Sequence, residues 1–222
     1  MNIYNIVDDR QSVRDYHDKE VPVALIEKVL TYALRAPSGG NLQPWNIHVV
    51  NGDSINRLKA TMHSRLNNAD AAEQPEYDIY PPNLKSPYRE RRFQIGEALY
   101  GQLGIPRKDK AARQAWFLRN FEFFGAPMGL FFTIDRSMGS PQWSDLGMIM
   151  QTIMLLLKAE GLDSCAQECW ALYPNTVGKF LKLEEEQMLF AGMAVGYGNY
   201  ENPVNRLKTE RADMGEVVTF YG

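Results

Sequence analysis

Cysteine is scarce in this chain of 222 residues, with only Cys165 and Cys169 present. Two cysteines encode no disulfide framework, and the Cys-x-x-x-Cys spacing differs from that of a redox dithiol. The three histidines are isolated from the thiols and from one another, so they complete no metal-ligand pattern. We therefore expect two small buried thiols and no metal site.

Long hydrophobic runs and an excess of basic charge are also missing. The most continuous apolar segment, 188–197, is far shorter than the ~20 residues that span a bilayer. Residues 1–9 lack the basic and apolar regions of a signal peptide. The net charge of −3 and the isoelectric point near 5.7 argue against general binding to nucleic-acid phosphates. These absences predict a cytoplasmic protein with neither a membrane span nor a nucleic-acid partner.

Two glycine-rich nucleotide motifs are absent as well. The sequence contains neither Gly-x-Gly-x-x-Gly nor a Gly-Lys-Ser/Thr loop, which excludes a Rossmann cradle and a P-loop. If the protein uses a nicotinamide cofactor, that cofactor must visit a site formed by something other than a dinucleotide-binding fold of this chain.

What remains has the composition of an ordinary globular domain, 45% hydrophobic and 23% charged, without repeats or an evident linker. We expect a single α+β domain over residues 1–222. Apolar periodicity and turn residues predict helices opening at 21–22 and covering 54–68, 110–124 and 145–160, and strands over 46–50, 129–134 and 188–195.

The helix predicted over 145–160 is apolar nearly all round. Ser144 or Asp145 is expected to cap its first turn, and Gly161 to end it. A helix with apolar side chains on every face must be buried on every face. In a chain of this size, that pattern predicts a helix at the core of a dimer as well as of the protomer.

The segment Ala36-Pro37-Ser38-Gly39-Gly40-Asn41-Leu42-Gln43-Pro44-Trp45 joins a predicted helix to a predicted strand. Its glycines let the backbone approach a flat ligand, and its Ser, Asn and Gln side chains present donors and acceptors. A ligand-binding loop and a plain turn before a core strand both fit this composition. We call residues 37–43 the Gly39 loop.

Arg10, Ser12 and Arg14 form a second cluster near the start of the chain. In a helix, residues four apart share a face, and in an extended segment, alternate residues do. Both conformations allow the two guanidinium groups to converge on an anion. Scattered surface arginines are the competing interpretation.

Together these clusters resemble the nitroreductase family of FMN-dependent oxidoreductases. The resemblance rests on Arg10-x-Ser12-x-Arg14-x-Tyr16 and on Pro37-Ser38-x-x-Asn41-x-Gln43-Pro44-Trp45. It continues through Asp145-Leu146-Gly147, Gly161-Leu162-Asp163, Glu168, Val195-Gly196-Tyr197 and Arg211. Only residues 69–110 are particular to a branch of the family.

The resemblance implies a fold and a dimer. It implies a central, mostly antiparallel sheet flanked by helices, in an intertwined homodimer with FMN at the subunit interface. Arg10, Ser12 and Arg211 are expected at the FMN phosphate, and Arg14 at the pyrimidine edge of the flavin. Pro37, Ser38, Gly39, Asn41 and Gln43 of the partner subunit are expected against the flavin and ribityl chain, and the backbone N–H of Glu168 at flavin N5.

The sequence departs from its relatives at three positions. Gly39-Gly40 replaces a serine-containing pair of some members, and Cys169 stands where many members have glycine. Thr209 stands where some relatives have a second basic residue for the phosphate, so Lys208 or Arg206 is a candidate substitute.

The implied activity is that of an NAD(P)H oxidoreductase. NADH or NADPH passes a hydride to flavin N5 and leaves, and a small aromatic acceptor then binds the same face in a ping-pong cycle. Nitroaromatics are the first candidates for this acceptor and quinones the second. No side-chain general base is required, because the cofactor supplies the chemistry.

Three alternatives stay open. The same fold supports reductive dehalogenation of halotyrosines, for which Glu76, Tyr80 and Lys85 are candidates to hold an amino-acid zwitterion. It also supports oxygen-dependent destruction of the flavin. From another class, the chain could be a non-catalytic FMN carrier or regulator.

Residues 69–110 are predicted to be a lid and specificity insertion, with Tyr77, Tyr80, Pro81, Pro82 and 88–92 as its functional part. A surface insertion without function is the competing interpretation. Trp45 and Trp170 are expected to be core packing residues.

Overall fold

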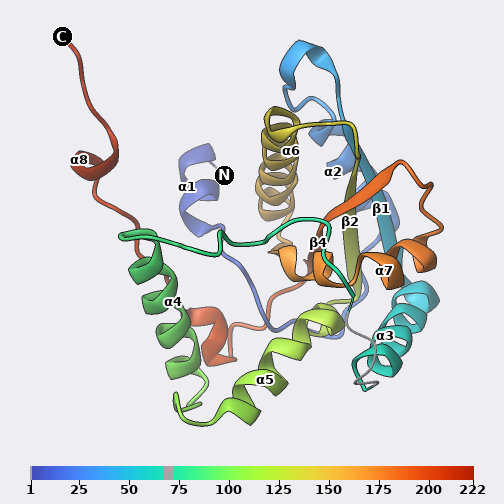
Figure 1. The fold of residues 1–222 in the computed structure, drawn as a ribbon, viewed down its shortest axis with the longest axis horizontal. Helices are drawn as coiled ribbons and strands as arrows, with labels where there is room; N and C mark the ends of the chain where they lie inside the picture. Colours follow the sequence, from blue (N-terminus) through green and yellow to red (C-terminus); the bar gives the residue numbers. More distant parts are fainter. Residues whose placement is uncertain (1, 68–72) are drawn as a thin grey trace.

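The computed structural model describes residues 2–67 and 73–222. The helix predicted over 54–68 and the insertion predicted over 69–110 extend into residues 68–72, which lie outside the described part. A four-stranded antiparallel sheet with strand order β1-β2-β4-β3 forms the centre (Figure 1). Its strands are β1 (Trp45–Asn51), β2 (Met128–Asp135), β3 (Asp163–Gln167) and β4 (Gln187–Gly196). The α+β prediction is confirmed.

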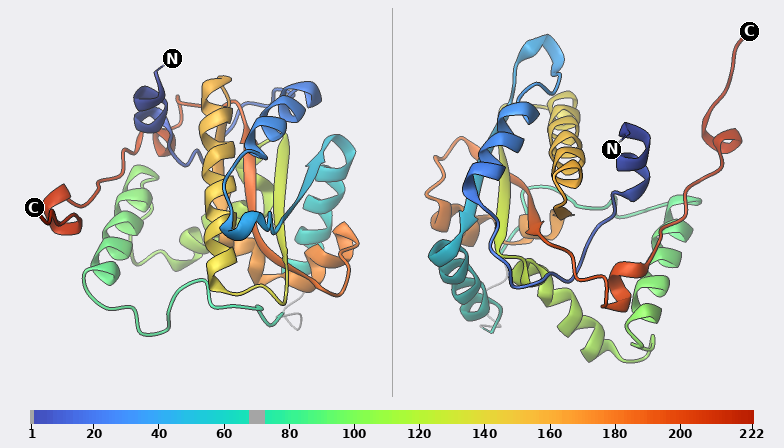
Figure 2. Two further views of the ribbon diagram at one scale, coloured as in Figure 1. Left: turned by 90° about the horizontal axis from the view of Figure 1, so that it is seen from above. Right: turned by 180° about the vertical axis from the view of Figure 1, so that it is seen from behind.

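Helices cover both faces of the sheet (Figures 1 and 2). Helices α2 (Val23–Ala33) and α6 (Ser140–Ala159) pack on one face, and α3 (Gly52–Leu66) and α7 (Pro174–Leu181) pack on the other. Strand β2 is buried on both faces, so its alternate residues enter two separate cores. This explains its continuous apolar sequence, because a strand covered on both sides has no polar face.

Helix α6 begins earlier than predicted. It starts at Ser140, where Pro141 occupies the first turn and the Gln142 side chain accepts a hydrogen bond from the backbone N–H of Gly139 at 3.2 Å. Asp145 is therefore buried in the second turn and does not cap the helix. The predicted end is confirmed, since Gly161 follows with φ 77°.

One face of α6 stays incompletely covered within the chain. Leu146, Ile149, Ile153 and Leu157 are fully buried against the sheet. Met148 and Leu155 on the opposite side, and Met154 and Leu156 at the margins of the buried face, are only half-buried. The all-round burial expected of this helix is therefore not completed by a single protomer.

The helix predicted over 110–124 ends at Leu118. Helix α5 (Lys110–Leu118) gives way to the 3₁₀ segment η2 (Arg119–Gly125), in which Phe123 and Phe124 adopt left-handed φ values of 52° and 54°. This backbone buries both rings in one core, where Phe123 lies 4.6 Å from Trp170 between ring centroids. Tertiary packing of the aromatic side chains overrides the helical pattern here.

The predicted buried residues behave as expected. Trp45 and Trp170 lie in the two cores, and both cysteines are buried free thiols. Three short 3₁₀ segments complete the body of the fold: η1 (Gly39–Asn41), η3 (Glu168–Leu172) and η4 (Pro203–Arg206).

Peripheral helices extend away from the sheet. These are α1 (Ile3–Asp9), α4 (Tyr88–Gln102) and α8 (Met214–Val217). Figure 2 shows α8 and the C-terminus projecting from the body, beyond α4. Apolar side chains of these elements and the tail are exposed, among them Tyr4, Met214, Val217, Phe220 and Tyr221. No helix in the described ranges is long and apolar enough to cross a membrane.

Candidate functional site

The Arg10–Arg14 segment is extended rather than helical. Ser12 forms a parallel bridge with Ser164 of β3, and the backbone N–H of Val13 donates to the Ser164 carbonyl at 3.1 Å. Val13 is completely buried. Because side chains alternate along an extended chain, the side chains of Arg10, Ser12 and Arg14 lie on the side opposite to that of Val13. The structure thus decides between the two conformations that the sequence left open.

Asn205 of η4 fixes this segment to the end of the chain. Its Oδ1 accepts from the backbone N–H of Arg14 at 2.7 Å, and its Nδ2 donates to the Asp15 carbonyl at 2.8 Å. The side chain is buried, so these hydrogen bonds are made away from water. Sequence reasoning missed Asn205, because nothing in the local pattern distinguishes it from a surface asparagine.

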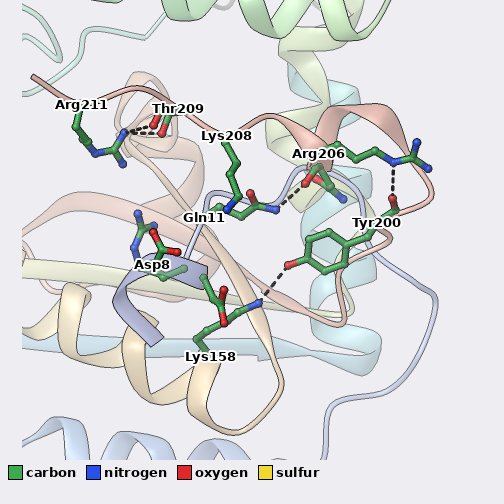
Figure 3. Close-up of a pocket in the computed structure, with 11 residues that line it drawn as sticks. Asp8, Gln11, Lys158, Tyr200, Arg206, Lys208, Thr209 and Arg211 are labelled. Atoms are coloured by element: carbon green, nitrogen blue, oxygen red, sulfur yellow. Dashed lines mark hydrogen bonds between the residues drawn. The ribbon is translucent and has the colours of Figure 1, made fainter. Parts of the chain in front are cut away.

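Arg10 and Arg211 line one cavity of about 430 Å³, which we call the cationic cavity (Figure 3). Burial and the charge of Arg211 together lower the pKa of Arg10. Asp8 and Asp9 also line the cavity, but among the described residues neither forms an ion pair with an arginine. Its full lining is Asp8, Asp9, Arg10, Gln11, Lys158, Tyr200, Asn205, Arg206, Lys208, Thr209 and Arg211.

The two candidate substitutes for a second phosphate cation differ in their surroundings. The Arg206 guanidinium donates to the carbonyls of Tyr200 and Glu201, both at 2.9 Å. Figure 3 shows Arg206 directed toward Tyr200, whereas Lys208 extends toward Gln11 inside the cavity. Lys208 is therefore better placed to meet an anion, and Arg206 instead holds the backbone of the preceding loop.

Thr209 supports Arg211 rather than supplying charge. The Arg211 guanidinium donates to Oγ1 and to the carbonyl of Thr209, the latter at 3.1 Å. These local hydrogen bonds limit the orientations of a long side chain that is otherwise exposed.

The floor of the cavity is formed by Lys158 and Tyr200, which line it and both contact the buried Asp163. Asp163 accepts hydrogen bonds from Lys158 at 3.0 Å and from the hydroxyl of Tyr200 at 2.7 Å. Burial disfavours the ammonium form of Lys158. The hydrogen bond to Asp163 and the charge of Asp163 outweigh the effect of burial, so the pKa of Lys158 is raised. Burial, reinforced by Asp163, also raises the pKa of Tyr200. The three residues join α6, β3 and the loop after β4.

The Gly39 loop lies beside the other end of α6. The backbone N–H of Gly39 donates to Oδ1 of Asp145 at 3.1 Å, and that of Gln43 donates to Oγ of Ser38 at 2.9 Å. Gly40, Asn41 and Gln43 all have left-handed φ values, between 51° and 57°. The side chains of Asn41 and Gln43 are exposed, so the loop presents them outward.

The two predicted clusters do not meet within one chain. The Gly39 loop contacts Asp145, whereas the cationic cavity includes Lys158, 13 residues further along α6. At 1.5 Å per residue, these positions are about 20 Å apart along the helix axis. The structure brings Arg10 and Arg211 together in one cavity, whose lining does not include Ser12 or Arg14, and it leaves the Gly39 loop apart from them.

Glu168 lies beside a second cavity, of about 420 Å³, which we call the Glu168 cavity. Burial raises the pKa of its carboxyl. Three residues of the predicted lid, Ile79, Tyr80 and Arg92, line the same cavity, and the Arg92 guanidinium lies 3.8 Å above the centre of the Tyr80 ring. The full lining is Ile79, Tyr80, Arg92, Phe117, Asn120, Ala166, Gln167, Glu168, Cys169 and Leu172.

The segment that carries Tyr80 is anchored to the body. Tyr77 packs against Trp143 and Phe190, at 5.3 and 5.8 Å between ring centroids, and its hydroxyl donates to the Phe190 carbonyl. Glu76 forms a bidentate ion pair with Arg136, with both contacts at 2.9 Å. Residues 76–80 are thus held over the sheet before the chain continues to α4.

The fold and the two cavities define a class: an α+β protein with a cationic cavity, lined by Arg10, Lys208 and Arg211, and a second cavity with aromatic and polar walls. The nitroreductase family model matches residues 7–197, and the chain belongs to that family.

Relatives of known activity cover almost the whole chain. It is 34% identical to a nitrobenzene nitroreductase of Ectopseudomonas oleovorans, covering 98% of this chain and 96% of that protein. It is 36% identical to a 4-nitrobenzoate reductase of Pseudomonas putida, with coverages of 97% and 93%. The solved structure of the FMN- and NADPH-dependent nitroreductase NfnB from Sphigopyxis sp. strain HMH is similar over 100% of both chains, with a TM-score of 0.96 and 46% identity.

Proposed function

We propose that this protein is an FMN-dependent oxidoreductase that uses NADPH, or NADH, to reduce nitroaromatic compounds. The single observation that carries the proposal is the placement of Arg10 and Arg211 in one cavity, where burial and the charge of Arg211 lower the pKa of Arg10. Two guanidinium groups held close together are stabilised by an anion between them. We take this anion to be the phosphate of FMN. The nitroreductases with which the chain aligns over nearly its full length support this assignment.

The residues of the cationic cavity fit the phosphate of FMN. Arg10 and Arg211 would hold it with charge-assisted hydrogen bonds, and Ser12 on the same side would add a hydroxyl. Arg14 would lie at the pyrimidine edge of the flavin, where a cation favours the reduced cofactor. Its position is fixed by Asn205 and by its own hydrogen bond to the Ser12 carbonyl at 3.2 Å.

We further propose that the site is completed in an intertwined homodimer. The Gly39 loop of the partner subunit would supply the Pro37, Ser38, Gly39, Asn41 and Gln43 contacts to the flavin and ribityl chain. Three observations support this: the separation of the two clusters along α6, the half-buried apolar side of that helix, and the exposed apolar residues of α1, α8 and the tail.

When bound, FMN would supply the hydride chemistry, through N5, in two successive half-reactions with donor and acceptor. The chain itself would position the ligands. The backbone N–H of Glu168 would face N5, and the Glu168 cavity would receive the nicotinamide and then the acceptor. The proposed reaction requires no side chain as general base. The walls of the Glu168 cavity would select flat acceptors.

An anaerobic absorbance titration tests this function. The purified protein should show the ~450 nm band of oxidised flavin. NADPH should bleach that band, and a nitroaromatic compound should restore it. A yellow protein that neither nicotinamide bleaches would support the carrier alternative or a flavin-consuming enzyme instead. A colourless protein that does not bind added FMN would contradict the cofactor assignment itself.

Reductive dehalogenation is the weaker candidate. Glu76 is one of the three candidates for holding an amino-acid zwitterion, but its carboxylate already accepts hydrogen bonds from Nε and Nη2 of Arg136. Quinones remain the second class of acceptor, because they share the flat, electron-poor character of nitroaromatics.

A further inference from the structure

Three arginines lie in the first turns of α4, and one of them differs from the others in its partner. Arg89 forms an ion pair with Glu90 at 2.7 Å, and Arg91 with Glu216 at 3.0 Å. Arg92 forms no ion pair with any carboxylate in the part of the chain that the structure describes. Its guanidinium instead lies flat over Tyr80, at 3.8 Å from the ring centroid.

This arrangement leaves the polar edge of Arg92 available. A guanidinium stacked on an aromatic ring loses part of its hydration at the stacked face, while its N–H groups still point outward in the ring plane. The stack also restricts the rotamers of a long side chain, so binding an anion costs less conformational entropy. Arg92 is therefore an oriented donor whose guanidinium has no acceptor among residues 2–67 and 73–222.

The place of Arg92 determines what it can meet. It lines the Glu168 cavity with Tyr80, Ile79, Phe117 and Leu172, a largely apolar set that suits a flat aromatic ligand. Among the residues lining this cavity, Arg92 is the one permanent cation and Glu168 the one carboxylic acid. The positive end of the cavity thus lies in α4, and the end beside the proposed flavin contact carries the acid.

We infer that Arg92 is a specificity residue that selects aromatic acceptors bearing an anionic substituent, in the first place a carboxylate. The inference rests on the proposed function. In the bound acceptor, the carboxylate would pair with Arg92 over Tyr80, while the ring lies along the apolar walls and the reducible group points toward Glu168. A neutral acceptor of the same shape would use the same walls without the ion pair.

Matched substrates and matched variants test this inference. In the FMN-loaded enzyme reduced by NADPH, 4-nitrobenzoate and its neutral analogue 4-nitrobenzamide are compared by kcat/KM. In Arg92→Gln we expect kcat/KM for 4-nitrobenzoate to fall about tenfold, which is the loss of a charge-assisted contact. The value for 4-nitrobenzamide should change less than about twofold, because no ion pair is lost with the neutral amide.

Arg89→Gln is the control, since Arg89 lies on the same helix but is paired with Glu90 and does not line the cavity. It should leave both substrates unchanged. Added salt should raise the KM of the parent enzyme for 4-nitrobenzoate but not that of Arg92→Gln. Unreactive benzoate should perturb the flavin spectrum of the oxidised parent enzyme at lower concentration than benzamide, and this difference should disappear in Arg92→Gln.

Two results would overturn the inference. In the first, Arg92→Gln lowers kcat/KM for both nitro substrates equally, which would make Arg92 a structural residue of the lid. In the second, the variant changes kcat/KM for NADPH relative to NADH while the two nitro substrates keep their ratio, which would assign Arg92 to the nucleotide phosphate. A parent enzyme that reduces neither 4-nitrobenzoate nor 4-nitrobenzamide would instead refute the proposed function, so the two failures are distinguishable.

Discussion

The backbone N–H of Gly39 donates a hydrogen bond to Oδ1 of Asp145 at 3.1 Å. The carboxylate is buried, and its second oxygen, Oδ2, has no hydrogen-bond partner among the described residues. A buried acid is thus used to hold a single peptide of an exposed loop. Because the loop also contains three residues with left-handed backbone, this contact helps to maintain a conformation that most side chains disfavour.

Replacing Asp145 should therefore weaken cofactor binding. We expect Asp145→Ala to raise the Kd for FMN about tenfold, because the loss of a buried charged acceptor leaves the Gly39 amide unpaired. Asp145→Asn keeps an oxygen that can accept from Gly39 and should retain most of the affinity. Flavin fluorescence titration measures both constants. Equal losses in the two variants, accompanied by equal losses in thermal stability, would contradict a role in positioning the loop.

The second phosphate cation can be identified by comparing FMN with riboflavin, which lacks the phosphate. Lys208→Gln should weaken FMN binding about fivefold, as expected for one partly exposed cation, and leave riboflavin binding unchanged. Arg206→Gln should affect both flavins alike, because the Arg206 guanidinium is bound to two backbone carbonyls. The opposite pattern would assign the phosphate to Arg206.

The contacts of Lys158 and Tyr200 with Asp163 should make the protein less stable at alkaline pH. The folded state raises the pKa of Lys158 above 10.5 and that of Tyr200 above 10.0, so it favours the protonated form of both groups. Their contribution is complete below the unfolded pKa values and is lost as the pH rises through the folded ones. The free energy of unfolding in urea should fall more steeply above about pH 10 in the parent protein than in Tyr200→Phe. Parallel profiles would refute the assignment.

Glu73 should be important for the stability of α7. Its carboxylate, only 4% exposed, accepts from the backbone N–H groups of Asn175 at 2.7 Å and Thr176 at 3.2 Å and pairs with Arg65 at 3.1 Å. Glu73→Ala removes a helix cap and leaves Arg65 without its partner, and we expect it to lower the free energy of unfolding by about 2 kcal/mol. Chemical denaturation measures this loss. Glu76→Ala, which breaks a more exposed ion pair, serves as the comparison and should cost less.

Much of the fold was predictable because its strands and main helices carry strong local patterns. The predicted strands over 46–50, 129–134 and 188–195 lie within β1, β2 and β4. Strand β3 was not predicted, since Asp163–Gln167 contains few apolar residues and becomes a strand only by pairing with β4. The left-handed turn at Phe123 and Phe124 was likewise invisible, because it results from packing against Trp170 rather than from local propensity.

The site was predictable to the extent that its residues lie in compact motifs. Arg10 and Arg211 were expected to meet although they lie at opposite ends of the sequence, and they share a cavity. Asn205 and Tyr200 were missed, because a single polar residue in a loop reveals nothing of the buried partners that it acquires on folding. Roles toward the cofactor stay predictions that the experiments above address.

The position of α6 between the Gly39 loop and the cationic cavity has a genetic consequence. Suppose that each site takes its phosphate cations from one subunit and its Gly39 loop from the other. A substitution in the cationic cavity and a substitution in the Gly39 loop of the same subunit then damage different sites of the dimer. A hybrid of an Arg211→Gln subunit and a loop-defective subunit then contains one doubly damaged site and one intact site. Two inactive variants, unfolded and refolded together, should therefore complement each other and recover activity, as should cells that express both alleles.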